Sequence, residues 1–114
     1  MEILEEQREG VYIFMPVGRL DSNTSPEFEE RVFQAVGDGR YQVIFDFGRL
    51  DYLSSAGLRV VLKTAKALKA KEGALVICAP ADYVREVFEI SGFDTFLPIE
   101  ATRQAALDAL QSTD

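Results

Sequence analysis

The chain of 114 residues contains no histidine, no tryptophan and a single cysteine, Cys78. The absence of histidine excludes Ser-His-Asp and Cys-His catalysis, imidazole proton shuttles and histidine metal sites. A single cysteine excludes an intrachain disulfide, and its place in the apolar run 74–79 predicts a buried, unreactive thiol. The sequence therefore lacks the residues on which most familiar hydrolases and redox enzymes depend.

Long apolar runs are also missing. None is long enough to cross a bilayer, and the acidic N-terminus lacks the basic and apolar regions of a signal peptide. We therefore expect a cytoplasmic protein with no membrane partner. The length, the four prolines and the 47% of hydrophobic residues are typical of one folded domain, which we expect to span residues 1–114.

Positive charge is in deficit. Twelve Lys and Arg residues against 19 Asp and Glu residues give a net charge of −7. A nucleic acid would be repelled by such a surface instead of exchanging counterions with it. We therefore expect no direct binding of DNA or RNA.

Strand and helix patterns alternate along the chain. β-Branched and aromatic residues predict strands at 11–17, 41–47 and 75–78, an extended neighbour at 2–6 and a short strand at 96–99. Pro16 marks an edge or the end of a strand, and 48–53 is predicted as a turn. Helical spacing predicts helices that start at Ser25, at Ser54 or Ser55, near Pro80 and at Thr102. This order predicts the α/β class, with at least part of the sheet parallel.

Two serines stand where the strand 41–47 has ended, a turn has been made and a long helix begins. A serine at such a place is most often a helix N-cap, and that role fits Ser54 or Ser55. Gly57 is a poor helix residue that would let another surface approach closely, and the small Ala56 leaves the serines uncovered. These two residues indicate an exposed docking site.

Three aspartates lie near predicted strand ends: Asp21, Asp46 and Asp51. A turn or capping carboxylate is the simplest interpretation of Asp21, and a parallel sheet would place it at the same edge as the serines. The three carboxylates are also compatible with a Mg²⁺ site or an aspartyl-phosphate pocket. No glycine-rich phosphate loop accompanies them.

The order of several motifs resembles a known family. Gly18-Arg19-Leu20-Asp21 with Thr24, the strand 43–47 and Ser54-Ser55-Ala56-Gly57-Leu58 are similar to the STAS domain of bacterial anti-sigma factor antagonists. Ile90-Ser91-Gly92-Phe93 extends the resemblance over nearly the whole chain. The resemblance implies a single STAS-like domain, with a mixed four- to five-stranded sheet and helices packed mainly on one face.

The resemblance also implies a phosphorylation site. In that family the serine two positions before the glycine is phosphorylated by an anti-sigma factor that is an ATP-binding serine kinase, and a phosphoserine phosphatase reverses the step. The matching residue is Ser55, with Ser54 as the alternative because many members carry Asp in place of Ser54. The implied partner-binding residues are Asp21, Ser22, Thr24, Ser54, Ser55, Ala56, Gly57 and Arg59.

The function implied in this way is partner switching. The unphosphorylated form binds the kinase and releases a sigma factor or another output, and phosphorylation abolishes the binding. The chain is then a binder and a substrate, not an enzyme, with no cofactor, catalytic residue or metal of its own. Two alternatives stay open: a non-phosphorylated STAS subunit of a transporter or lipid-trafficking assembly, and a small-molecule or nucleotide sensor or hydrolase with a polar pocket at the strand tips.

Overall fold

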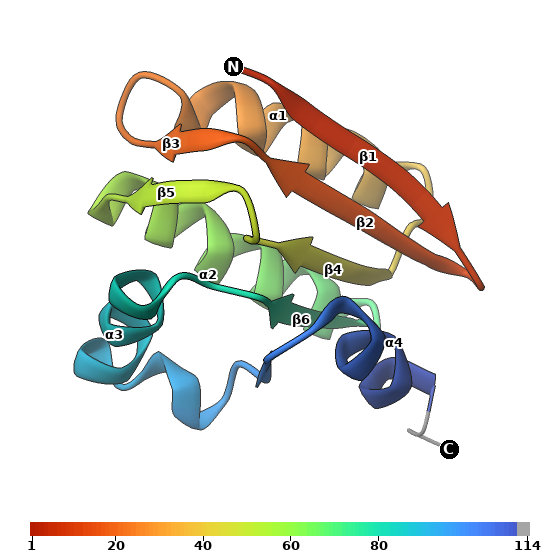
Figure 1. Cartoon of the computed structure of the whole chain (residues 1–114). Helices are drawn as coiled ribbons and strands as arrows, with labels where there is room; N and C mark the ends of the chain where they lie inside the picture. Colours follow the sequence, from red (N-terminus) through yellow and green to blue (C-terminus); the bar gives the residue numbers. More distant parts are fainter. Residues whose placement is uncertain (112–114) are drawn as a thin grey trace.

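Strands and helices alternate along residues 1–111, the part of the chain that the computed structural model describes (Figure 1). The elements are β1 (Ile3–Arg8), β2 (Val11–Pro16), β3 (Gly18–Leu20), α1 (Ser25–Gly37), β4 (Gln42–Asp46), β5 (Leu50–Leu53), α2 (Ser55–Ala70), β6 (Ala74–Cys78), α3 (Asp82–Ser91), the 3-10 helix η1 (Phe93–Thr95), β7 (Ile99–Glu100) and α4 (Arg103–Gln111). The expected domain of residues 1–114 includes 112–114, which lie outside the described residues.

The main sheet has five strands in the order β1-β2-β4-β6-β7. β1 and β2 are antiparallel, and the other pairs are parallel. The predicted mixed sheet is confirmed, and the strand predicted at 41–47 is its central strand, β4. Val43 and Phe45 enter the core on one face of β4, while Ile44 enters the core on the other. This burial on both faces explains the uninterrupted apolar run 43–45.

Three of the four helices in residues 1–111 cover one face of the sheet (Figure 1). α1, α2 and α3 supply Phe28, Val61 and Phe88 to the larger core, and α4 covers the smaller core on the other face with Leu107. The prediction of helices mainly on one face is confirmed. No helix within residues 1–111 has the length and apolar character needed to cross a membrane.

The prediction of a turn at 48–53 is wrong for residues 50–53. Leu50–Leu53 is the strand β5, which pairs in parallel with β3. β3 is a strand separate from β2, because β2 ends at Pro16 and Gly18 has a φ of +96°. Pro16 therefore marks a strand end, since β2 lies between β1 and β4. The β3–β5 pair carries the chain beyond the main sheet (Figure 1).

Smaller corrections concern the element ends. The strand predicted at 96–99 is reduced to Ile99–Glu100, because η1 and the turn after it occupy the preceding residues, with the Leu97 N–H donating to the Phe93 carbonyl at 3.0 Å. The first helix starts at Ser25 as predicted, but its N-cap is Thr24. The terminal helix starts one residue late, after Thr102, whose hydroxyl accepts from the Ala105 N–H at 3.0 Å.

Candidate functional site

The ends of β3 and β5 meet at the start of α2. Leu20 and Leu53 are neighbours in the parallel pair, and the Ser54 N–H donates to the Leu20 carbonyl at 2.9 Å. Asp21 follows the one strand and Ser54 follows the other. The expectation that the aspartate and the serines lie at the same edge is therefore confirmed.

The two serines have different surroundings. Ser54 is the N-cap of α2, with an extended backbone and a half-buried side chain whose Oγ accepts from the Gly57 N–H at 3.3 Å. Ser55 is the first residue of the helix, and its side chain is exposed. Within residues 1–111 its hydroxyl makes no hydrogen bond. The free hydroxyl at this helix start is thus that of Ser55.

Gly57 was expected to leave room for another surface at an exposed docking site, but it has a different role in the structure. It is buried, and a Cβ placed on it would lie 2.7 Å from Leu53 Cδ1, 2.9 Å from Leu20 Cβ and 3.0 Å from the Leu20 carbonyl oxygen. The surface that approaches Gly57 closely is therefore the chain's own β3–β5 pair, and not a partner. The glycine lets the first turn of α2 lie against the strand ends, which fixes the position of the serines.

The loop after β3 is held by its own side chains. The Asp21 Oδ1 accepts from the N–H groups of Asn23 and Thr24 at 2.9 and 3.1 Å. The Thr24 Oγ1 accepts from the Asp21 N–H at 3.0 Å and donates to the Arg19 carbonyl at 2.7 Å. These backbone hydrogen bonds lower the pKa of Asp21, and the Thr24 hydroxyl and Arg19 act in the same direction. Asp21 is a turn carboxylate, as its simplest interpretation predicted.

The three aspartates do not form a metal-binding group. Asp46 is the last residue of β4, and its carboxylate is bound by other partners: its Oδ2 accepts from Arg103 Nε at 3.0 Å and its Oδ1 from the Gly48 N–H at 2.9 Å. Across residues 1–111, no three Asp, Glu, His or Cys side chains are placed to hold a metal ion. The Mg²⁺ site considered for Asp21, Asp46 and Asp51 is therefore not formed.

A groove of about 440 Å³ runs between α1 and α2 beside the serines. It brings together Ser22, Ala56 and Arg59 from the predicted set. The remaining lining comes from the α1 side, with Ser25, Pro26, Glu29, Glu30 and Phe33, and from Val60. Sequence reasoning missed the α1 contribution, because the packing of two helices over one sheet face is not visible in the spacing of either.

Two aromatic residues next to the site were also missed. The Arg19 guanidinium lies 4.2 Å from the centre of the Tyr52 ring, and Tyr52 and Tyr83 are both exposed. The helix α3, which carries Tyr83, packs against β5, which carries Tyr52. Partial burial raises the pKa of Tyr83, and the charge of Asp51 acts in the same direction. Tyr52 falls within the segment mistaken for a turn, which hid its place beside Arg19.

The chain has well-defined relatives. The model of the STAS domain family matches residues 2–106. A protein of Bordetella bronchiseptica named as a candidate anti-sigma factor antagonist, BtrV, is 41% identical over 112 residues, which cover 98% of this chain and 97% of the relative. An anti-sigma-B factor antagonist of Staphylococcus aureus is 30% identical over 82 residues, with 72% of this chain and 76% of the relative covered. The crystal structure of an anti-sigma factor antagonist from Mycobacterium paratuberculosis superimposes with a TM-score of 0.90 at 26% identity, over 96% of this chain and 93% of that one.

Proposed function

The chain belongs to the STAS domain family of anti-sigma factor antagonists, and from this membership we propose that it works by partner switching. In this proposal the unphosphorylated form binds an ATP-using anti-sigma factor serine kinase and so releases a sigma factor or another output. Phosphorylation of Ser55 abolishes the binding, and a phosphoserine phosphatase restores it. The chain acts in the cytoplasm as a binder and a substrate, and the kinase supplies the chemistry.

One observation carries the choice of Ser55. Its hydroxyl is exposed and free of hydrogen bonds within residues 1–111, whereas the hydroxyl of Ser54 caps the helix. A kinase must reach the acceptor oxygen and place it in line with the transferred phosphoryl group. Ser55 meets that demand without any change in the fold, but Ser54 would first have to give up its bond to Gly57.

The fold is expected to tolerate the phosphate. A phosphoserine carries about two negative charges, and the N-terminus of a helix stabilises such charge through its free N–H groups and its dipole. The first turn of α2 contains no acidic residue that would repel the phosphate. Arg59 stands one turn further along the same helix, exposed and without a salt bridge among the described residues. Residues four apart on a helix are neighbours, so Arg59 is placed to pair with the new charge.

The cost of phosphorylation therefore falls on the complex. The groove between α1 and α2 already contains Glu29 and Glu30, and the chain carries a net charge of −7. A new dianion that faces a carboxylate or an apolar partner surface costs on the order of 1–4 kcal/mol. That cost weakens binding by roughly tenfold to several-hundredfold, which is sufficient to release a partner. If the phosphate also engages Arg59, the partner loses that contact as well.

The test uses three variants of the full chain and the kinase that the wild-type protein captures from lysate of its own organism. With the purified kinase, ATP and Mg²⁺, wild type gains the mass of one phosphoryl group, and Ser55→Ala gains none while keeping its affinity. Ser54→Ala is the matched control. It loses a cap worth about 1 kcal/mol but is still phosphorylated. Ser55→Glu binds more weakly than wild type.

Each contrary outcome has a clear meaning. Mass gain in Ser55→Ala, or its loss in folded Ser54→Ala, moves the site to Ser54. A partner that is not a kinase, bound equally by wild type and Ser55→Glu, supports a non-phosphorylated subunit of a transporter or lipid-trafficking assembly. Saturable nucleotide binding by the isolated chain that is lost in Asp21→Ala supports the sensor alternative.

A further inference from the structure

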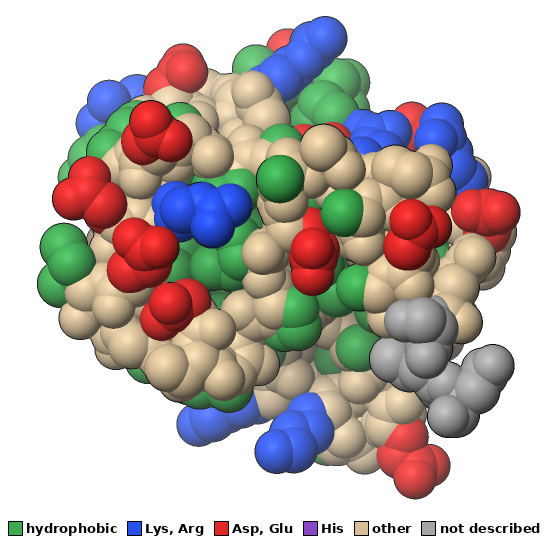
Figure 2. Space-filling model, turned by 60° about the horizontal axis from the view of Figure 1, so that its bottom comes forward, with side chains coloured by type: hydrophobic (Ala, Val, Ile, Leu, Met, Phe, Trp, Pro, Cys, Tyr) green, Lys and Arg blue, Asp and Glu red, His purple; other side chains and the backbone are tan. Residues whose placement is uncertain are grey.

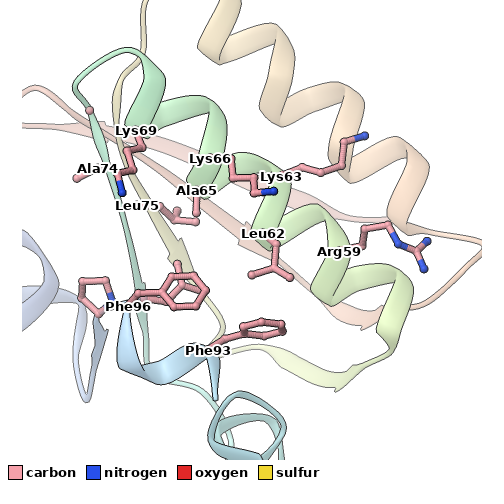
Figure 3. A pocket seen from close by; sticks show the side chains of 13 residues that line it. Arg59, Leu62, Lys63, Ala65, Lys66, Lys69, Ala74, Leu75, Phe93 and Phe96 are labelled. Carbon is pink, nitrogen blue, oxygen red and sulfur yellow. The ribbon is translucent and has the colours of Figure 1, made fainter. Parts of the chain in front are cut away.

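A second hollow lies on the opposite side of α2 from the groove between α1 and α2. Its volume is about 790 Å³, and it lies between α2, the start of β6 and the segment from η1 to Pro98. Figure 3 shows Leu62, Ala65 and Leu75 between the helix and the strand, with Phe93 and Phe96 facing them across the hollow. Small-molecule sites in proteins have volumes of about 300–1,000 Å³ and mainly apolar walls. The hollow is therefore large enough for one small ligand.

The wall opposite α2 carries an exposed aromatic pair. Phe93 and Phe96 pack edge to face with their ring centres 5.7 Å apart, and Phe96 is 60% exposed. Such an edge-to-face pair offers ring surface to a third apolar group that enters the hollow. Exposure of an aromatic ring to water is unfavourable in free energy, and an apolar ligand between Phe96 and Leu62 would remove that exposure.

The charges around the hollow all have one sign. Its lining includes Arg59, Lys63, Lys66 and Lys69 and no acidic residue, in a chain with 12 cationic and 19 anionic side chains. Acidic side chains are spread across the face turned to the viewer in Figure 2, which makes a purely cationic rim unusual for this molecule. An anionic group is thus favoured here by the local charge, against the charge of the chain as a whole.

Two of these cations are available to a ligand. Lys63 extends toward α1, where its Nζ lies 2.6 Å from Glu29 Oε2, and Arg59 also lines the groove on the other side of α2. Lys66 and Lys69 make no salt bridge among the described residues, and they stand one turn apart on the α2 side of the hollow (Figure 3). Their aliphatic stems can cover an apolar ligand while the ammonium groups hold its head.

We propose that this hollow binds a free fatty-acid-type ligand, a single acyl chain with one anionic head. The acyl chain lies between Phe96 on one side and Leu62 and Leu75 on the other, and the head group pairs with Lys66 and Lys69. The site is separate from Ser55, so that this proposal stands or falls independently of partner switching.

The probe is laurate, kept below the concentration at which it forms micelles, titrated into the full chain and followed by amide NMR shifts. Saturable one-site binding with the largest shifts at residues of the hollow is expected. The double variant Lys66→Glu/Lys69→Glu binds at least about tenfold more weakly, because two attractive charges become repulsive. Lys71→Glu is the control: it makes one such Lys-to-Glu change just beyond the end of α2, outside the hollow, and leaves the affinity unchanged.

A second variant tests the apolar wall. Phe96→Ala removes a side chain that is mostly exposed, so the protein folds normally while laurate binds several-fold more weakly. The uncharged methyl ester of laurate, with the same chain, also binds more weakly than laurate. Circular dichroism of each variant confirms that it is folded.

The proposal is overturned if laurate shows no saturable binding below micelle formation, or if the charge-reversed variant binds it as well as Lys71→Glu does. Binding to phosphatidylglycerol vesicles without binding of monomeric laurate would assign the hollow to a membrane surface instead. Binding of an acidic amphipathic peptide in the hollow, with no binding of laurate, would assign it to a protein partner.

Discussion

Replacing Gly57 with alanine tests whether the first turn of α2 is held against the strand ends. An added methyl group would stand 2.7 Å from Leu53 Cδ1, which can move, but also 2.9 Å from Leu20 Cβ and 3.0 Å from the Leu20 carbonyl oxygen. The last two atoms belong to or adjoin the backbone of β3, and they cannot retreat without shifting the strand.

Two opposing effects set the magnitude of this change. Alanine gains about 1 kcal/mol over glycine in helix propensity. Overpacking of a buried site costs typically about 1–3 kcal/mol, and contact with the backbone places Gly57 toward the upper end. We therefore expect Gly57→Ala to lower the free energy of unfolding by about 1–2 kcal/mol. For a domain of this size the melting temperature falls by roughly 4 °C for each kcal/mol.

The matched control is Gly37→Ala at the end of α1. A Cβ at Gly37 meets nothing within 4 Å, and the residue has no positive φ, so that only the propensity gain remains. We expect this variant to be as stable as wild type or up to about 1 kcal/mol more stable. Urea unfolding followed by circular dichroism measures both. Equal stability of the two variants, or a more stable Gly57→Ala, would refute the packing role assigned to Gly57.

Three further predictions concern polar groups. Arg103→Gln leaves the buried carboxylate of Asp46 without its charged partner and is expected to cost about 1–3 kcal/mol in urea unfolding, whereas Arg8→Gln, at an exposed ion pair, changes little. The pKa of Asp21 is lowered below its ordinary 3.8, so the contribution of its carboxylate to stability is complete above that pH and is lost as the pH falls below it. The difference in free energy of unfolding between wild type and Asp21→Asn, measured by urea titration, should therefore be smaller at about pH 3 than at about pH 7. Burial raises the pKa of Cys78 to about 12, so iodoacetamide should label it only after unfolding, and rapid labelling of the native protein would contradict its burial.

The elements of the main sheet and the helices were predictable because their patterns are long or uninterrupted. The strand predicted at 41–47 has three consecutive apolar residues, 43–45, and the helix that begins at Ser55 continues for 16 residues with one buried face. β5 was not predictable in this way. It has four residues, of which only the first and last are buried, so that neither alternation nor a continuous apolar run is present. Its pairing with β3 is a tertiary contact.

The candidate site was likewise predictable only in part. The serines and Asp21 lie at the ends of strands and the start of a helix, which turn and capping residues indicate in the sequence. The structure places them at one edge as expected. The α1 side of the groove and the exposed pair Tyr52 and Tyr83 carry no such mark, because their neighbours come from other elements. Gly57 shows the limit most directly. Its poor helix propensity is visible in the sequence, but one of the two residues that lie against it, Leu20, is distant in the sequence and comes close only in the fold.

Under the proposed function, the adjacent serines divide two tasks that a single serine could not perform together. An N-cap hydroxyl must stay directed at the N–H of the first turn, and Ser54 does so toward Gly57 with a half-buried side chain. An acceptor for a phosphoryl group must be free to turn toward an enzyme, and Ser55 has that freedom. Because the capping bond belongs to Ser54, a charge placed on Ser55 leaves the helix start intact and adds to it the anion that the helix dipole favours. Under the proposed function, phosphorylation therefore changes what the surface binds without changing whether the domain is folded.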